Sequence, residues 1–192
     1  MIIILFTSAA LAAGFHAGIP VQGVPGLGAP TFHDALTGWS APVVDEAGQP
    51  QGVARVYVAP TTAAAQAWVE DAVRAVQAPM GALPGLADLA LATSGAVVAR
   101  DGNVAIAVSV HEGDPLVAAR SLVAAIEETP AAWPQAPTLR AVQGGWEIDA
   151  AGAVGWTITG GQRPLGQPDT WSVLPQEIVA WDGWGRASVM RP

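Results

Sequence analysis

The chain has 192 residues, of which 51% are hydrophobic and 12% are charged, and its formal net charge at pH 7 is −8. This composition supports a packed core and argues against global disorder, and the absence of cysteine excludes disulfides, thiolate metal sites and a cysteine nucleophile. The basic residues, all arginine, are spread along the chain rather than clustered, which argues against binding to nucleic acid or to anionic lipid.

The first residues predict a secretory leader. An apolar run at residues 2–6 is followed by small residues and by an A-x-A sequence at residues 10–12. The run is too short to span a bilayer as a helix, which takes about 20 residues. We therefore expect cleavage before Ala13, export to the bacterial periplasm or beyond, and no stable membrane anchor afterwards; the intact mass of native protein would report the cut. The alternative is a buried first strand at residues 2–6.

Residues 13–38 are rich in glycine and proline and show neither helical nor strand periodicity. We expect a flexible segment here, followed by a single folded domain over residues 39–192. The segment contains GVPGLG at residues 23–28, but no predicted strand precedes it and no predicted helix follows. The glycines therefore do not indicate a dinucleotide-binding fold.

Short stretches that combine aspartate with glycine predict four hairpins. Asp bonds to its own following backbone and Gly accepts positive φ, so both residue types suit tight turns between apolar runs. The four stretches are residues 45–48, 101–102, 149–152 and 182–183. The second lies within AVVARDGNVAIAV, residues 96–108, which is nearly all apolar. We therefore expect that hairpin at the centre of a sheet.

Two helices are predicted between the hairpins. Residues 61–77 place apolar side chains on one stripe at helical spacing, with Pro60 before them and Pro79 after them. The second helix is predicted to begin with Asp114 as N-cap and Pro115 as its first residue, and to end before Pro130.

The order of these elements predicts an α+β domain, in which an antiparallel sheet built from hairpins has two helices packed on one face. Residues 130–137 are expected to link this part to a Trp-rich part with hairpins from about residue 138. With so few residues after the linker, we expect the Trp-rich part to extend the same sheet.

The stretch GLADLALATSGAVVARDGNVAIAVSV, residues 85–110, is followed by the helix that begins after Asp114. Over residues 55–127 this arrangement resembles small extracytoplasmic bacterial domains of the kind found in lipoproteins and sensor-kinase ectodomains. Such domains often carry a cysteine anchor or disulfides, which this chain lacks. The resemblance implies a non-catalytic binding or sensing module and assigns no functional residue.

The sequence contains none of the nucleophile-elbow, P-loop or zincin motifs and predicts no cofactor and no metal site. His16 and His33 lie in the Gly/Pro-rich segment. His111 lies beside Glu112 and close to Asp114, so a hydrolase-type site formed by His111 and a nearby carboxylate is an alternative to a non-catalytic role.

Tryptophan is the most unusual component, since five of the eight fall in the last quarter of the chain. A two-residue turn at Asp182 and Gly183 would pair Trp181 with Trp184 and, by alternation, place both on one less buried face with Arg186. The candidate ligand-binding residues are Trp156, Trp171, Trp181, Trp184 and Arg186. These residues form either a platform for a glycan or a protein partner, or a local hydrophobic cluster.

From the sequence we therefore expect an exported, non-catalytic binding or sensing domain of unspecified ligand. A secreted hydrolase and a structural or assembly protein are the alternatives. The sequence does not specify an oligomeric state.

Overall fold

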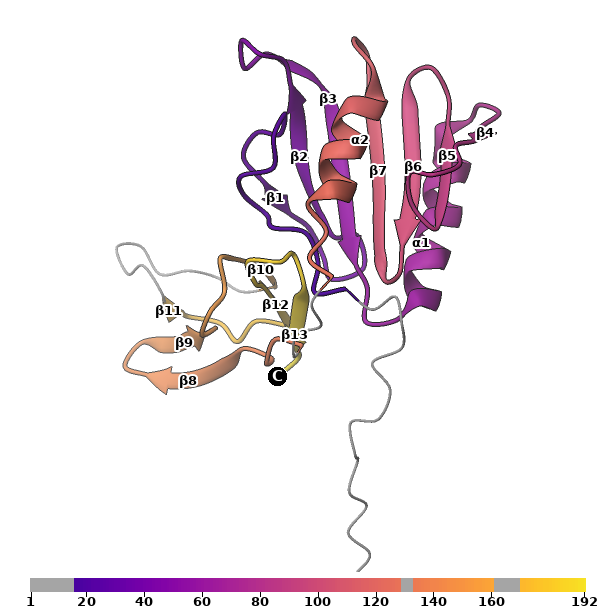
Figure 1. The fold of residues 1–192 in the computed structure, drawn as a ribbon. Coiled ribbons are helices and arrows are strands. Elements are labelled where there is room, and N and C mark those ends of the chain that lie inside the picture. The colour runs from indigo at the N-terminus through magenta and orange to yellow at the C-terminus, as the bar shows by residue number, and fades with distance from the viewer. Residues whose placement is uncertain (1–15, 129–132, 161–169) are drawn as a thin grey trace, which may run out of the picture.

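A computed structural model describes residues 16–128, 133–160 and 170–192 of the chain; the predicted leader lies outside these ranges. The largest element is a seven-stranded antiparallel sheet with the strand order β1-β2-β3-β7-β6-β5-β4 (Figure 1). Its strands are β1 (Thr31–Phe32), β2 (Trp39–Val44), β3 (Pro50–Val58), β4 (Gly81–Ala82), β5 (Leu89–Ala92), β6 (Ala96–Asp101) and β7 (Val104–Val110). Together with two helices this sheet confirms the predicted α+β class, and β7 is its central strand.

Both helices begin within one residue of the predicted start, and the second has its predicted cap. Helix α1 (Thr62–Val76) has Thr61 as N-cap, whose side chain accepts a hydrogen bond from the N–H of Ala64. Helix α2 (Pro115–Ala124) has Asp114 as N-cap, whose side chain accepts from the N–H of Leu116. In the part of the chain that the structure describes, α1 and α2 are the only helices. Neither is long and apolar enough to cross a membrane.

The two helices lie on opposite faces of the sheet, so the prediction that both pack on one face is wrong. On β6 and β7, Val97, Ile106 and Val108 belong to the cluster that contains the buried side chains of α2. The alternate residues Val98 and Ala105 belong to the cluster that contains those of α1. The central hairpin is therefore covered on both faces, which explains why it is apolar throughout rather than alternating.

Residues 16–28 pack against the α2 face of the sheet, so the prediction of a flexible segment is wrong for this part. Ala17, Ile19 and Val21 are at most 5% exposed, and they follow the two-residue period of a strand. The side chain of Asn103, fully buried, fixes the start of the segment by accepting from the N–H of His16 at 2.6 Å and donating to its carbonyl at 3.2 Å. Gly18 and Pro20 interrupt the apolar pattern and hid the alternation in the sequence.

The C-terminal part forms two further antiparallel sheets, so the prediction that it extends the main sheet is wrong. One has the order β10-β12-β13 and the other the order β11-β9-β8. Their strands are β8 (Thr138–Val142), β9 (Gly145–Asp149), β10 (Gly155–Thr159), β11 (Thr170–Trp171), β12 (Glu177–Trp181) and β13 (Ala187–Met190). Figure 1 shows them beside one end of the main sheet.

Of the four predicted hairpins, those at residues 45–48, 101–102 and 182–183 join paired strands. The hairpin predicted at residues 149–152 is wrong, because β9 and β10 belong to different sheets. Strand β9 instead pairs with β8 across a tight turn at Gln143 and Gly144.

Candidate functional site

The first candidate site is the connection between β12 and β13, which we call the docking loop (residues 182–186). Trp181 pairs with Ala187, so the predicted two-residue turn and its pairing of Trp181 with Trp184 are wrong. The cause is the side chain of Asp182. Its Oδ1 accepts hydrogen bonds from the N–H groups of Trp184 and Arg186, both at 3.0 Å, and so closes a longer loop.

A buried ion pair lies within the docking loop. The Nε and Nη2 atoms of Arg186 lie 2.7 Å and 2.6 Å from Oδ2 of Asp182, and the two side chains are 6% and 14% exposed. The Arg186 guanidinium also lies over the ring of Trp133, 5.9 Å from its centroid. This cation–π contact joins Arg186 to the linker and not to the tryptophans of the β12–β13 hairpin.

The docking loop joins three segments that are distant in the sequence. The N–H of Ile19 donates to the carbonyl of Trp184 at 3.2 Å, and the N–H of Val21 donates to that of Gly183 at 3.0 Å. On its other side, Arg186 forms a parallel β-bridge with Val58, the last residue of β3. These contacts attach the C-terminal sheets to the main sheet, which is a structural role.

The glycines of the docking loop provide a test of this attachment. Gly185 has φ +74°, and a Cβ there would lie 2.2 Å from Nε1 of the buried Trp39. Gly185→Ala is therefore expected to destabilise the protein by about 1–2 kcal/mol for the left-handed backbone alone, plus the cost of moving the ring. Chemical denaturation measures this loss. Gly183→Ala is the matched control, because its Cβ would meet only Val154, at 4.0 Å, and a similar loss there would refute the argument.

The predicted tryptophans do not form one exposed platform. Trp181 is 1% exposed and stacks on Phe32, with ring centroids 5.6 Å apart. Trp171 is 5% exposed and meets Trp156 edge-on at 4.9 Å. Trp184 is half-buried, and only Trp156 is substantially open, at 38%. The structure thus brings Trp156 and Trp171 together and places Trp181 at a separate contact with the main sheet.

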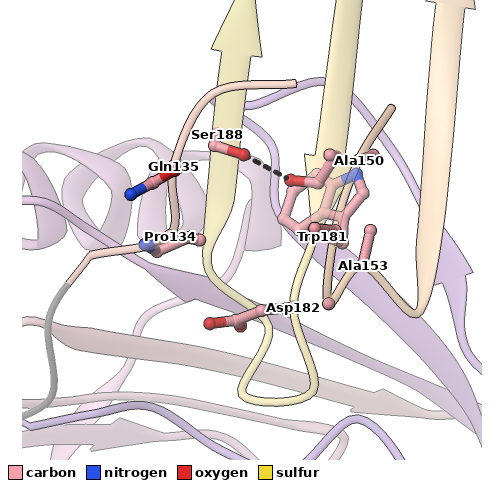
Figure 2. A pocket seen from close by; sticks show the side chains of 10 residues that line it. Pro134, Gln135, Ala150, Ala153, Trp181, Asp182 and Ser188 are labelled. Carbon is pink, nitrogen blue, oxygen red and sulfur yellow. Dashed lines mark hydrogen bonds between the residues drawn. The ribbon is translucent and has the colours of Figure 1, made fainter. Parts of the chain in front are cut away.

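The cavity beside Trp181 is too small for a ligand. Figure 2 shows it between the β12–β13 hairpin, the linker residues Pro134 and Gln135, and the turn that contains Ala150 and Ala153. Its volume is about 20 Å³, which is enough for about one water molecule. At this cavity the described residues of the Trp-rich end pack together and leave no space of ligand size.

A larger concavity, the α2 groove, lies on the α2 face of the main sheet. Its volume is about 370 Å³, within the usual range of about 300–1,000 Å³ for small-molecule sites. It is lined by residues 25–26, 43–45, 51, 110, 112–114 and 117–118. The N-terminal segment, the β2–β3 hairpin, the end of β7 and the start of α2 each contribute one wall.

The apolar surface of the α2 groove comes mainly from valines. Val43 and Val44 end β2 and Val110 ends β7, and Val117 on α2 is 66% exposed. An exposed valine at the edge of a concave apolar surface is available for contact with a ligand.

Asp45 and Asp114 stand at the rim of the α2 groove and are held by backbone groups. Asp45 Oδ1 accepts from the N–H groups of Ala47 and Gln49 at 2.9 and 2.8 Å. The hydrogen bond from the Gln49 N–H is the main reason why the pKa of the Asp45 carboxyl lies below its usual value. Asp45 therefore carries its negative charge throughout the neutral and mildly acidic range.

The three histidines have different partners and do not form one cluster among the described residues. His16 is buried, and its Nε2 lies 3.2 Å from Asp101 Oδ1; His33 Nε2 lies 2.8 Å from Ser40 Oγ. His111 is exposed, and its backbone N–H donates to the carbonyl of Gln51 at 2.9 Å. Among the described residues, no group of three or more His, Asp or Glu side chains is arranged to hold a metal ion.

Comparison with known protein families, characterised proteins and solved structures returns no significant match for this chain.

Sequence reasoning missed the α2 groove. Its residues were recognised singly, Asp45 as a turn residue and Asp114 as a helix cap, but the groove depends on β3 pairing with β7. This pairing brings Gln51 next to the β7–α2 connection across about 60 residues of chain, as the Gln51–His111 hydrogen bond shows. Turn and cap signals are local and do not predict which strands become neighbours.

Proposed function

We propose that this protein is an exported bacterial binding module that holds a small ligand non-catalytically in the α2 groove. The observation that carries the proposal is the groove itself, a concave, mostly apolar surface of about 370 Å³ with a few polar side chains at its rim. The proposal of export rests on the leader-like sequence at residues 1–12.

The polar groups support binding rather than proton transfer. Asp45 and Asp114 use Oδ1 to close a turn and to cap a helix, so both carboxylates are held in place by backbone N–H groups. A general acid at neutral pH needs a raised pKa, whereas the pKa of Asp45 is lowered. Fixed charges at the edge of an apolar surface are suited to orienting a ligand.

Titration of the ¹⁵N-labelled full chain with a library of small organic fragments tests this function. We expect the amides of residues 43–45 and 112–118 to shift together, while those of the docking loop stay unchanged. Val117→Asn adds no charge and is expected to weaken binding of the fragments about fivefold, equivalent to about 1 kcal/mol for the apolar contact that the valine loses.

Val154→Asn is the matched control, because Val154 is also exposed, at 50%, and does not line the groove. Fragments that shift only the amides around Trp156, or that bind equally well to the Val117 variant, would overturn the assignment of the site to the α2 groove.

A further inference from the structure

Each polar side chain that lines the α2 groove contains a hydrogen-bond acceptor. Three are the carboxylates Asp45, Glu112 and Asp114, and the fourth is the amide of Gln51; no arginine or histidine lines the groove. A ligand that enters the groove therefore meets negative charge over an apolar floor.

The amide of Gln51 adds to this acceptor character. Its Nε2 donates to Asp45 Oδ2 at 3.1 Å, and a carboxylate oxygen can only accept, so the orientation of the amide is fixed. Oε1 is buried and has no hydrogen-bond partner in the described part of the chain. The Gln51 amide thus has an acceptor without a donor beneath the lining of the groove, and this atom is not itself open to a ligand.

The N-terminus of α2 would ordinarily favour an anion at this position, because helix N-termini expose unpaired N–H groups. Here those donors are already occupied or missing. Pro115 has no N–H, the N–H of Leu116 donates to Asp114 Oδ1 at 2.9 Å, and that of Val117 donates to Asp114 O at 3.2 Å. The carboxylates therefore determine the sign of the charge that the groove attracts.

We propose that the α2 groove binds a small molecule that carries a protonated amine on an apolar body. This inference rests on the proposed function and specifies its ligand class. The valines contact the apolar body, while the ammonium group lies among Asp45, Glu112 and Asp114 and supplies donors to acceptors only. The groove volume suits one small molecule rather than an extended peptide.

Three probes with one body and three head groups test the proposal: 4-phenylbutylamine, 4-phenylbutan-1-ol and 4-phenylbutyric acid. Affinities are measured from the amide shifts of residues 43–45 and 112–118 in the full chain. We expect the amine to bind about tenfold more tightly than the alcohol, and the acid to bind most weakly. The preference for the amine should shrink as the ionic strength rises.

Glu112→Gln removes one charge with little change of shape, and it should weaken the amine about two- to fivefold and leave the alcohol unchanged. Glu46→Gln is the control, because Glu46 lies exposed in the neighbouring β2–β3 turn outside the lining and changes the net charge equally.

Each remaining outcome separates this inference from the proposed function. If the alcohol binds in the groove as tightly as the amine, the cation specificity is wrong while the binding function stands. If the acid binds best, the charge argument is reversed. If a lysine-containing apolar tripeptide binds far more tightly than the amine, the small-molecule assignment is overturned. If neither these probes nor the fragment library shifts the groove amides, the proposed function fails as well.

Discussion

Trp181→Ala is expected to lower the free energy of unfolding by about 3–5 kcal/mol, the loss typical of a large aromatic side chain removed from a core. Trp181 is 1% exposed and stacks on Phe32 of β1, so the substitution removes the main aromatic contact between the C-terminal sheet and the main sheet. Denaturation by guanidinium, followed by circular dichroism and by fluorescence, measures the change.

Trp156→Ala is the matched control for this prediction. Trp156 is 38% exposed and its principal contact is the edge-on packing with Trp171, so the expected loss is no more than about 1.5 kcal/mol. If Trp181→Ala left stability intact and abolished ligand binding instead, Trp181 would belong to a binding platform and the structural role assigned to it here would be wrong.

Binding in the α2 groove should survive these substitutions as long as the protein stays folded. Gln51 and Val58 lie near opposite ends of β3, and at about 3.3 Å per residue they are about 23 Å apart. Substitutions separated by more than about 7–10 Å usually make independent contributions. The Trp181 and Val117 variants therefore separate the attachment of the C-terminal sheets from ligand binding.

The elements that the sequence predicted well are those specified by local chemistry. Asp114 and Pro115 place the start of the second helix, because capping and the fixed φ of proline act within one turn. Asp101 and Gly102 place the central hairpin for the same reason.

The predictions of strand pairing and of helix position failed because these features depend on which distant segments become neighbours. The chain does turn at residues 150–153, where the N–H of Ala153 donates to the carbonyl of Ala150, but turn chemistry does not determine whether the flanking strands pair with each other. The helices were assigned to one face although Val97 and Val98 are both apolar. That run of apolar residues is itself typical of a strand that is covered on both faces.

The candidate site illustrates the same limit. Tryptophans are unusually frequent near the C-terminus and were predicted as ligand-binding residues, yet Trp171 and Trp181 are buried. The α2 groove is built from ordinary valines and from aspartates with local structural roles. Only the pairing of β3 with β7 and the position of α2 bring them to one surface.

Asp182→Ala is the second substitution with a large expected effect, a loss of about 3–5 kcal/mol. It leaves the Arg186 guanidinium, 6% exposed, without the carboxylate that neutralises it, and it removes the acceptor for the N–H groups of Trp184 and Arg186. Glu177→Ala is the control: it breaks the pair of Glu177 with Arg191, in which the arginine is 73% exposed, and should cost at most about 1 kcal/mol.

Two further variants divide the effect of Asp182 between charge and loop closure. Asp182→Asn keeps a side-chain oxygen for the two N–H groups and loses only the charge, so its loss should lie between those of the wild type and Asp182→Ala. The double substitution Asp182→Ala with Arg186→Met removes the buried cation as well and should recover part of the lost stability, since a buried charge that has lost its carboxylate costs more than its absence. If the double variant were less stable than Asp182→Ala, the guanidinium would stabilise the docking loop through contacts other than Asp182, such as the one with Trp133, and the ion pair would not be the principal contact that closes the loop.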